Sequence, residues 1–184
     1  MIKNAKLTII QIIAFCLLLC PEVSCHKDVR AFMLITYFDL MNYAHDHEGW
    51  LPKSDKGPFD ALQKLYPDYC DGPELVGLSG DRDALLRALK NGEPLNAKLT
   101  SWVYVQGLRD TDDASLAVLW ESKSGLSSDG KNYHANGHAV IFLNATRKQI
   151  PESDWANFLE QQARLRQLVF ANRSLKANQQ PQTP

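Results

Sequence analysis

The chain has 184 residues, of which 45% are hydrophobic and 22% are charged. This composition is typical of a globular protein with its own core, and the length favours a single domain with appended segments. The formal net charge of −1 and the lack of a basic cluster exclude nucleic acid as the expected partner.

The N-terminus has the pattern of an export signal. Lys3 and Lys6 form a short positive region, and residues 7–20 (LTIIQIIAFCLLLC) carry no charge. This run is as long as the apolar region of a signal peptide and shorter than the roughly 20 residues of a membrane-spanning helix. We therefore predict that residues 1–25 are a signal peptide or a membrane anchor. The domain, residues 26–172, is then expected in the cell envelope, anchored to the inner membrane or in the periplasmic or extracellular space.

Three fates of this N-terminal segment stay open. Val23 and Cys25 are small enough to flank a signal-peptide cleavage site, so the segment is cleaved after Cys25 in the first alternative. In the second it is retained as an anchor that kinks at Pro21. The third is a lipoprotein, but Glu22 does not suit the motif that would modify Cys25.

Four helices are predicted from apolar residues that recur at steps of three and four. They cover residues 28–47, 59–66, 81–90 and 153–172. The boundaries come from residues that typically begin or end helices: Asp28, Gly49, Pro67, Asp81 and the pair Asn91-Gly92. Residues 69–80 contain four glycines or prolines and are expected to be irregular.

Four strands are predicted in the second half of the chain, at residues 101–106, 116–120, 138–143 and 146–150. Asn144-Ala145 separates the last two and suits a tight two-residue hairpin, although alanine disfavours the left-handed conformation of such turns. Polar residues 173–184 are expected to form a disordered tail. The predicted fold class is α+β: an N-terminal helix packed on a small antiparallel sheet, with a C-terminal helix.

Several short motifs in this order resemble type II secretion pseudopilins and their prepilin-like relatives. Residues 43–52 (YAHDHEGWLP) resemble the Y-A-x-D-x-G-x-F/Y-P stretch that ends the long helix of that family. Residues 61–69 (ALQKLYPDY) resemble its L-x-P-Y-L segment, and residues 139–145 (AVIFLNA) resemble the N-V-L-F-x-D-G hairpin of relatives common in planctomycetes. Residues 132–134 (NYH) resemble the N-H-G element of those relatives, and residues 152–155 (ESDW) match the start of the helix after the hairpin.

The resemblance spans about residues 28–158 and implies a pilin-like fold whose activity is assembly rather than catalysis. The prepilin cleavage signal is missing from the N-terminus, and Asn144-Ala145 stands where the family has Asp-Gly. The implied protein is thus a diverged relative that carries an ordinary export signal. Its expected partners are the membrane, further copies of the chain or other secretion-system proteins.

Two groups of metal-capable residues stand out in the sequence. His134 and His138 form one pair, which could bind zinc if it met a second pair, His45 and His47. His45 and His47 are two residues apart at a helix end and therefore point to different sides. The alternative is a solvated helix terminus, where histidine suits the helix dipole.

Asp110, Asp112 and Asp113 form the second group, in a loop between two predicted strands. Closely spaced carboxylates suit a hard cation such as calcium, and the pseudopilin resemblance implies a calcium site in the loops of the sheet. The spacing is not that of an EF-hand, and a solvated acidic turn is the alternative.

Nucleophile motifs are weak in this sequence. Ser79 lies in Gly77-Leu78-Ser79-Gly80, which is one residue short of the Gly-x-Ser-x-Gly elbow. Cys70 lies in the domain and would reach a disulfide with Cys25 only if Cys25 survives processing. The sequence therefore predicts a structural, non-catalytic assembly protein. The alternative function is an exported periplasmic binding module, with or without dependence on a metal.

Overall fold

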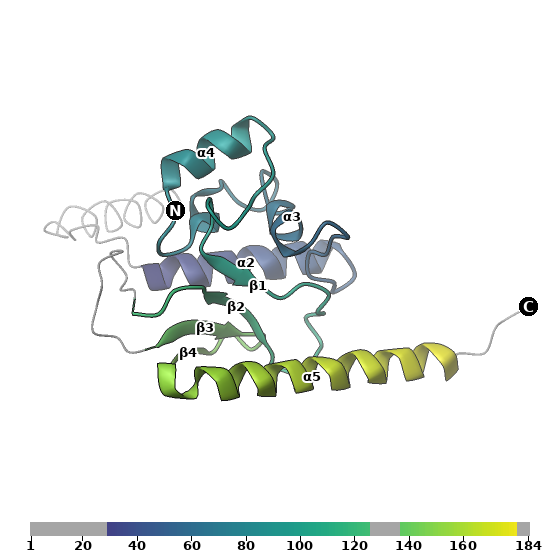
Figure 1. Ribbon diagram of the computed structural model, residues 1–184. Coiled ribbons are helices and arrows are strands. Elements are labelled where there is room, and N and C mark those ends of the chain that lie inside the picture. Colours follow the sequence, from purple (N-terminus) through teal and green to yellow (C-terminus); the bar gives the residue numbers. More distant parts are fainter. Residues whose placement is uncertain (1–28, 126–136, 180–184) are drawn as a thin grey trace, which may run out of the picture.

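A computed structural model describes residues 29–125 and 137–179 of the chain and confirms the predicted α+β class. Helices lie on both sides of a four-stranded antiparallel sheet (Figure 1). The predicted signal or anchor, residues 1–25, lies outside the described residues, and so does His134. In chain order the elements are α2 (Val29–Asp46), α3 (Pro58–Gln63), the 3-10 helix η1 (Pro73–Val76), α4 (Arg82–Lys90), β1 (Trp102–Tyr104), β2 (Ala117–Glu121), β3 (His138–Phe142), β4 (Arg147–Ile150) and α5 (Glu152–Gln179).

The sheet is a meander in the order β1-β2-β3-β4, as the strand pattern predicts. All five residues of β2 are buried, whereas the first three of β4, at the edge, are exposed. The register between β2 and β3 shifts between Ala117 and Leu119. Because of this bulge, Val118 and Leu119 both join the core under α2, while Ala117 and Trp120 join the core under α5.

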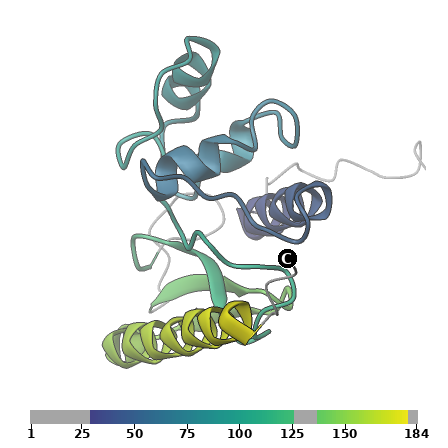
Figure 2. The same ribbon diagram turned by 90° about the vertical axis from the view of Figure 1, so that its right-hand side faces the viewer.

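Helix α2 covers one face of the sheet, and α5 covers the other (Figure 2). Met33, Tyr37, Leu40 and Ala44 recur at helical spacing and are all buried in the larger core. The helix ends where Glu48 and Gly49 adopt positive φ angles of 55° and 82°, and the Gly49 N–H donates to the Ala44 carbonyl. The predicted first helix and its glycine stop are therefore confirmed.

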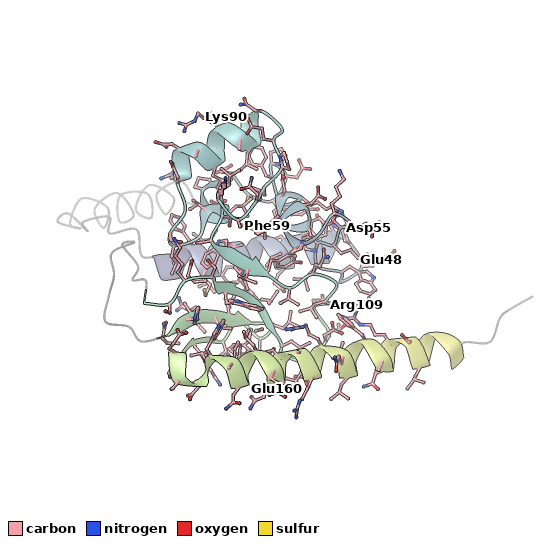
Figure 3. All side chains as sticks on the ribbon, viewed as in Figure 1. Glu48, Asp55, Phe59, Lys90, Arg109 and Glu160 are labelled. Carbon is pink, nitrogen blue, oxygen red and sulfur yellow. The ribbon has the colours of Figure 1, made fainter. Side chains whose placement is uncertain are left out.

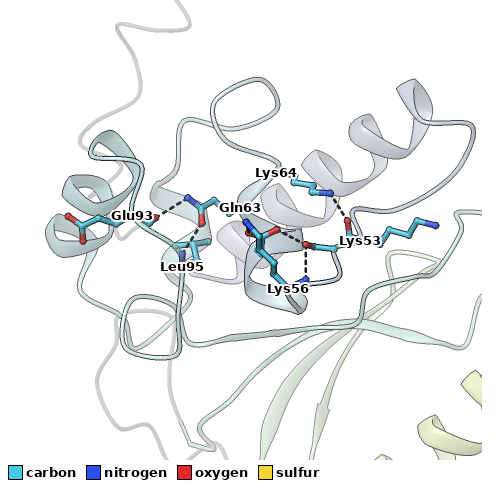
Figure 4. A network of polar contacts seen from close by, with 8 residues as sticks. Lys53, Lys56, Gln63, Lys64, Glu93 and Leu95 are labelled. Atoms are coloured by element: carbon cyan, nitrogen blue, oxygen red, sulfur yellow. Dashed lines mark hydrogen bonds and ion pairs between the residues drawn. The ribbon is translucent and has the colours of Figure 1, made fainter.

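Helices α3 and α4 and the segment between them add to the same core from beyond α2. Gln63 holds this layer together, since its amide donates to the Glu93 carbonyl and accepts from the Leu95 N–H (Figure 4). Asp81 caps α4 through the N–H groups of Asp83 and Ala84, as predicted. Residues 69–80 are more regular than expected, because Pro73 at its first turn opens the short helix η1.

Helix α5 begins at Glu152 and packs Phe158 against Phe142 of the sheet, with ring centroids 6.1 Å apart. Further along, the Gln162 side chain accepts from the Ala117 N–H and donates to the Ser115 carbonyl. The helix runs to Gln179, so residues 173–179 are helical where the sequence predicted the start of a disordered tail. Arg173 explains part of the difference, because it pairs with Asp112 and donates to the Gly107 carbonyl.

The β3–β4 hairpin differs from the predicted two-residue turn. The Ala145 N–H donates to the Phe142 carbonyl, and the Phe142 N–H donates to the Thr146 carbonyl. Leu143, Asn144 and Ala145 thus form a three-residue loop in which Ala145 has a φ of 63°. Alanine occupies the left-handed position that glycine normally fills, and its side chain packs against the core.

Candidate functional site

The outer face of α2, formed by Ile35 and Phe38, is the first candidate site. These side chains are 42% and 53% exposed, although the opposite side of the helix lies in the core. A helix on the surface of a monomer normally presents polar residues to solvent, whereas an apolar exposed face is typical of a contact surface. The outer face of α2 is therefore available for packing against a partner.

Two hydrogen bonds fix the orientation of α2 and thus of its outer face. The Tyr37 hydroxyl donates to the Leu143 carbonyl at 2.6 Å. The Thr36 hydroxyl lies 2.9 Å from the Phe32 carbonyl of its own helix and 3.1 Å from the Glu74 carbonyl, and it shares its single proton between them. Trp102 of β1 donates its indole N–H to the same Glu74 carbonyl at 2.7 Å. Because α2 is tied to both the sheet and η1, Ile35 and Phe38 are held on a rigid support.

The family-like stretch at residues 43–52 forms the corner after α2. His47 stacks on Tyr43 with ring centroids 3.7 Å apart, and its Nδ1 lies 2.8 Å from the Tyr43 carbonyl. Arg109 donates to the Glu48 carbonyl at 2.5 Å, and the two residues lie near one another between α2 and α5 (Figure 3). Three cationic side chains lie over the Trp50 ring: Lys53, Arg109 and Arg173. These contacts give the stretch a structural role, joining α2, the acidic loop and α5.

In the acidic loop, formed by Asp110, Asp112 and Asp113, the carboxylates of Asp112 and Asp113 have separate partners. Asp112 pairs with Arg173 and accepts from the Arg109 N–H, and Asp113 accepts from both the N–H and the hydroxyl of Ser115. The bonds from Ser115 lower the pKa of Asp113. The Asp110 side chain lies beside Gly49. A Cβ atom added to Gly49 would lie 2.5 Å from the Oδ1 atom of Asp110. Only 8% of the Asp112 side chain is exposed, so the loop is not solvated throughout, and calcium binding at the three carboxylates stays a prediction.

His138 is buried at the start of β3 and is engaged on both ring nitrogens. Its Nδ1 lies 3.0 Å from the Glu121 carbonyl, its Nε2 lies 3.3 Å from the Glu152 carboxylate, and its ring stacks on Trp155. The Glu121 carbonyl can only accept, so Nδ1 carries a proton. These contacts join β2, β3 and α5, and the predicted zinc pair with His134 stays a prediction because His134 lies outside the described residues.

A third cluster, formed by Asp39, Cys70 and Glu74, joins α2 to the segment that leads into η1. Among residues 29–125 and 137–179, these are the three metal-capable side chains whose ligand atoms all lie within 4.8 Å of one another. Desolvation, followed by the smaller effects of the Glu74 and Asp71 charges, raises the pKa of Asp39 to about 7. Desolvation and the Glu74 charge also raise the pKa of the Cys70 thiol to about 12.

Ser79, the residue of the incomplete elbow motif, belongs to a buried polar network rather than to a strand-to-helix turn. Its hydroxyl donates to the Glu121 carboxylate at 3.3 Å, and Ser101 donates to the same carboxylate at 2.7 Å. The Leu78 N–H donates at 2.9 Å, so Glu121 ties the loop before α4 to β1 and β2. Burial is the largest effect on the Glu121 carboxyl and raises its pKa, although these hydrogen bonds oppose the increase.

Sequence reasoning did not single out Asp39, Glu74 or Glu121. The sequence could have identified Asp39, because it is a charged residue next to the buried Leu40 in a helix with few polar residues. Glu74 had no comparable signal, since its position depends on how η1 folds back onto α2. Cys70 was identified as a domain residue, but its two carboxylate neighbours were not.

The comparisons with known proteins add no relative. No family model, no curated protein and no solved structure matches this chain. Within the ranges that the structure describes, no helix is both long and apolar enough to cross a bilayer.

Proposed function

We propose that this chain is an exported or membrane-anchored assembly protein, similar to a type II secretion pseudopilin, that acts by packing its N-terminal helix against the same helix of another copy. The observation that carries the proposal is the pair of exposed apolar residues on α2, Ile35 and Phe38, opposite a fully buried stripe. A helix with apolar residues on two opposite sides is expected to have both sides packed against protein when the protein is assembled.

The support beneath α2 fits an assembly role. The helix lies on the meander sheet, and hydrogen bonds from Tyr37 and Thr36 fix it at two points. A contact surface on a rigid element loses little conformational entropy when it binds. The side chains at the corner after α2, including His47 and Trp50, serve internal contacts rather than an open site.

The order of segments along the chain also supports the proposal. The uncharged run of residues 7–20 precedes α2 by only a short polar stretch. If that run enters the membrane, neighbouring copies are concentrated in two dimensions with their α2 helices close to the bilayer. Weak lateral contacts then suffice for assembly, because a shared anchor raises the effective concentration of each copy for the next.

Fractionation of cells that make the full-length chain tests the export half of this proposal. We expect to find the protein in the envelope fraction. N-terminal sequencing of that protein then shows whether residues 1–25 are removed. Recovery of the protein in the cytoplasm with Met1 intact would contradict export and anchoring together.

Substitution of the outer face of α2 tests the assembly half. A chain carrying Ile35→Asp and Phe38→Asp is expected to fold normally but to lose copy–copy contacts, because charges replace apolar contact area. Leu168→Asp is the matched control, since Leu168 is a 61% exposed apolar residue on α5. Equal copy–copy contact in all three proteins, measured by size and chemical cross-linking in membrane extracts, would overturn the proposal.

A binding module that depends on a metal is the second candidate function. The observation that favours it is the Asp39–Cys70–Glu74 cluster, which is buried, whereas Ile35 and Phe38 are exposed. The two functions are compatible, because a bound metal would strengthen the attachment of α2 to the domain.

A further inference from the structure

Asp39 is a buried carboxylate without a compensating partner. The residue is 8% exposed, and its Oδ2 atom accepts no hydrogen bond. An ionised carboxylate in such a place is costly unless a cation or hydrogen-bond donors neutralise it. The neighbouring carboxylates increase the cost of ionising Asp39, because Glu74 and Asp71 add negative charge beside it.

The groups around Asp39 are metal ligands. Cys70 is a free buried cysteine, and the ligand atoms of Asp39, Cys70 and Glu74 all lie within 4.8 Å of one another. Tetrahedral zinc with ordinary Zn–S and Zn–O bonds places sulfur and oxygen about 3.6 Å apart, so small side-chain adjustments would close the site. Thiolate together with carboxylate favours zinc over the hard cations calcium and magnesium, which prefer oxygen ligands alone.

Hydrogen bonds with residues other than the three ligands fix the positions of Glu74 and Cys70. The Glu74 backbone carbonyl accepts from Thr36 and Trp102, and the Glu74 carboxylate accepts from the Asp71 N–H at 3.1 Å. The Cys70 N–H donates to the Leu65 carbonyl at 3.1 Å. These bonds place the ligands before any ion arrives, which is the role of the outer shell in a protein metal site.

We propose that Asp39, Cys70 and Glu74 bind one Zn²⁺ ion, with water as the fourth ligand, and that the ion fastens α2 to η1. Binding releases the Cys70 proton and forms the Zn–S bond, with no change of oxidation state. Its three side chains are buried, whereas Ile35 and Phe38 are exposed, so this inference does not depend on the proposed assembly function.

Metal binding to the full-length protein tests the inference. The purified chain is stripped with a chelator and titrated with Zn²⁺ against a chromophoric competitor, and in parallel with Co²⁺, which reports thiolate ligation by charge-transfer absorption. We expect stoichiometric uptake, a thiolate–Co²⁺ band and a raised melting temperature. Cys70→Ser should abolish the band and weaken Zn²⁺ binding more than the roughly 10- to 100-fold that loss of an outer-shell partner costs.

Two controls separate this site from other metal-capable residues. Cys25→Ser removes a thiol outside the domain and should leave the band and the affinity unchanged. Asp39→Asn keeps the size of the side chain but removes the unpaired charge. It should raise the melting temperature of the metal-free protein and abolish the further rise with Zn²⁺.

Three results would overturn the site: no stoichiometric Zn²⁺ in the wild-type chain, a Co²⁺ band that persists in Cys70→Ser, or an unchanged Zn²⁺ response in Asp39→Asn. The last result decides the matter even if Cys70→Ser does not fold. If the protein does not bind Zn²⁺, the assembly proposal is unaffected. The experiments on Ile35 and Phe38 measure contacts between copies and not metal binding.

Discussion

The hydroxyl of Tyr37 donates a 2.6 Å hydrogen bond to the backbone carbonyl of Leu143, which directly follows β3. This bond links the first helix of the domain to the end of a central strand, 106 residues later in the chain. Tyr37 is buried, and burial raises the pKa of its hydroxyl, so the group remains a donor. The outer face of α2 depends on this link for its orientation.

Tyr37→Phe is therefore expected to lower the free energy of unfolding by about 1–3 kcal/mol, because the buried Leu143 carbonyl loses its donor. Urea denaturation of both proteins measures the difference. Tyr69→Phe is the control, since the Tyr69 hydroxyl donates to Asp46 in an exposed position and its loss should cost little. An equal effect of the two substitutions would contradict the anchoring role of Tyr37.

The ion pair between Arg173 and Asp112 is expected to stabilise the packing of α5 on the acidic loop. The Asp112 side chain is 8% exposed and that of Arg173 is 25% exposed. Arg173→Met should destabilise the protein by about 2–4 kcal/mol, because it leaves a nearly buried carboxylate without its cation. The Arg164–Glu160 pair, with exposures of 73% and 62%, is the control, and Arg164→Met should cost at most about 0.5 kcal/mol.

Ala145→Gly is expected to stabilise the protein by about 1 kcal/mol, because glycine adopts the positive φ of this loop position without steric strain. Thermal unfolding measures the change. The same substitution at Ala171, within α5, should instead destabilise by about 1 kcal/mol through lost helix propensity. A destabilising Ala145→Gly would show that the packing of the Ala145 methyl group outweighs its backbone strain.

The buried Glu121 carboxyl predicts a pH dependence of stability. Its pKa is raised in the folded protein, mainly by desolvation, so the folded state holds this proton more tightly than the unfolded state. The free energy of unfolding should therefore fall as the pH rises from the unfolded pKa of glutamate through the raised folded pKa. Glu121→Gln should reduce this decrease, and Asp39, whose pKa is raised to about 7, accounts for the part that remains.

Exposed Glu93 supplies the control for that pH series, because Glu93→Gln should leave the slope unchanged. Chemical denaturation at a series of pH values measures both variants. A slope as steep in Glu121→Gln as in the wild-type protein would assign the pH dependence to another group.

The regular parts of the fold were predictable because their signals are local. The stripe of Met33, Tyr37, Leu40 and Ala44 predicted α2. Apolar runs predicted the first three strands and a weak alternation predicted the fourth, in the observed order. The full length of α5 was missed, because residues 173–179 carry no apolar period and depend in part on Arg173 reaching Asp112 and Gly107.

The candidate metal site was less predictable, since it requires a contact between distant segments. Asp39 and Glu74 are 35 positions apart in the sequence. They lie close because the Glu74 carbonyl contacts both Thr36 of α2 and Trp102 of β1, which places η1 against these two elements. No local pattern contains that information. By contrast, exposure of Ile35 and Phe38 follows once the direction of the buried stripe is known.

Site-specific photo-cross-linking from position 38 in intact cells tests the central claim most directly. A photoreactive residue replaces Phe38 in one protein and Leu168 of α5 in a second. The assembly account predicts adducts between two copies of the chain from position 38 and far fewer from position 168. Equal yields from the two positions, or no copy–copy adduct from position 38, would contradict it.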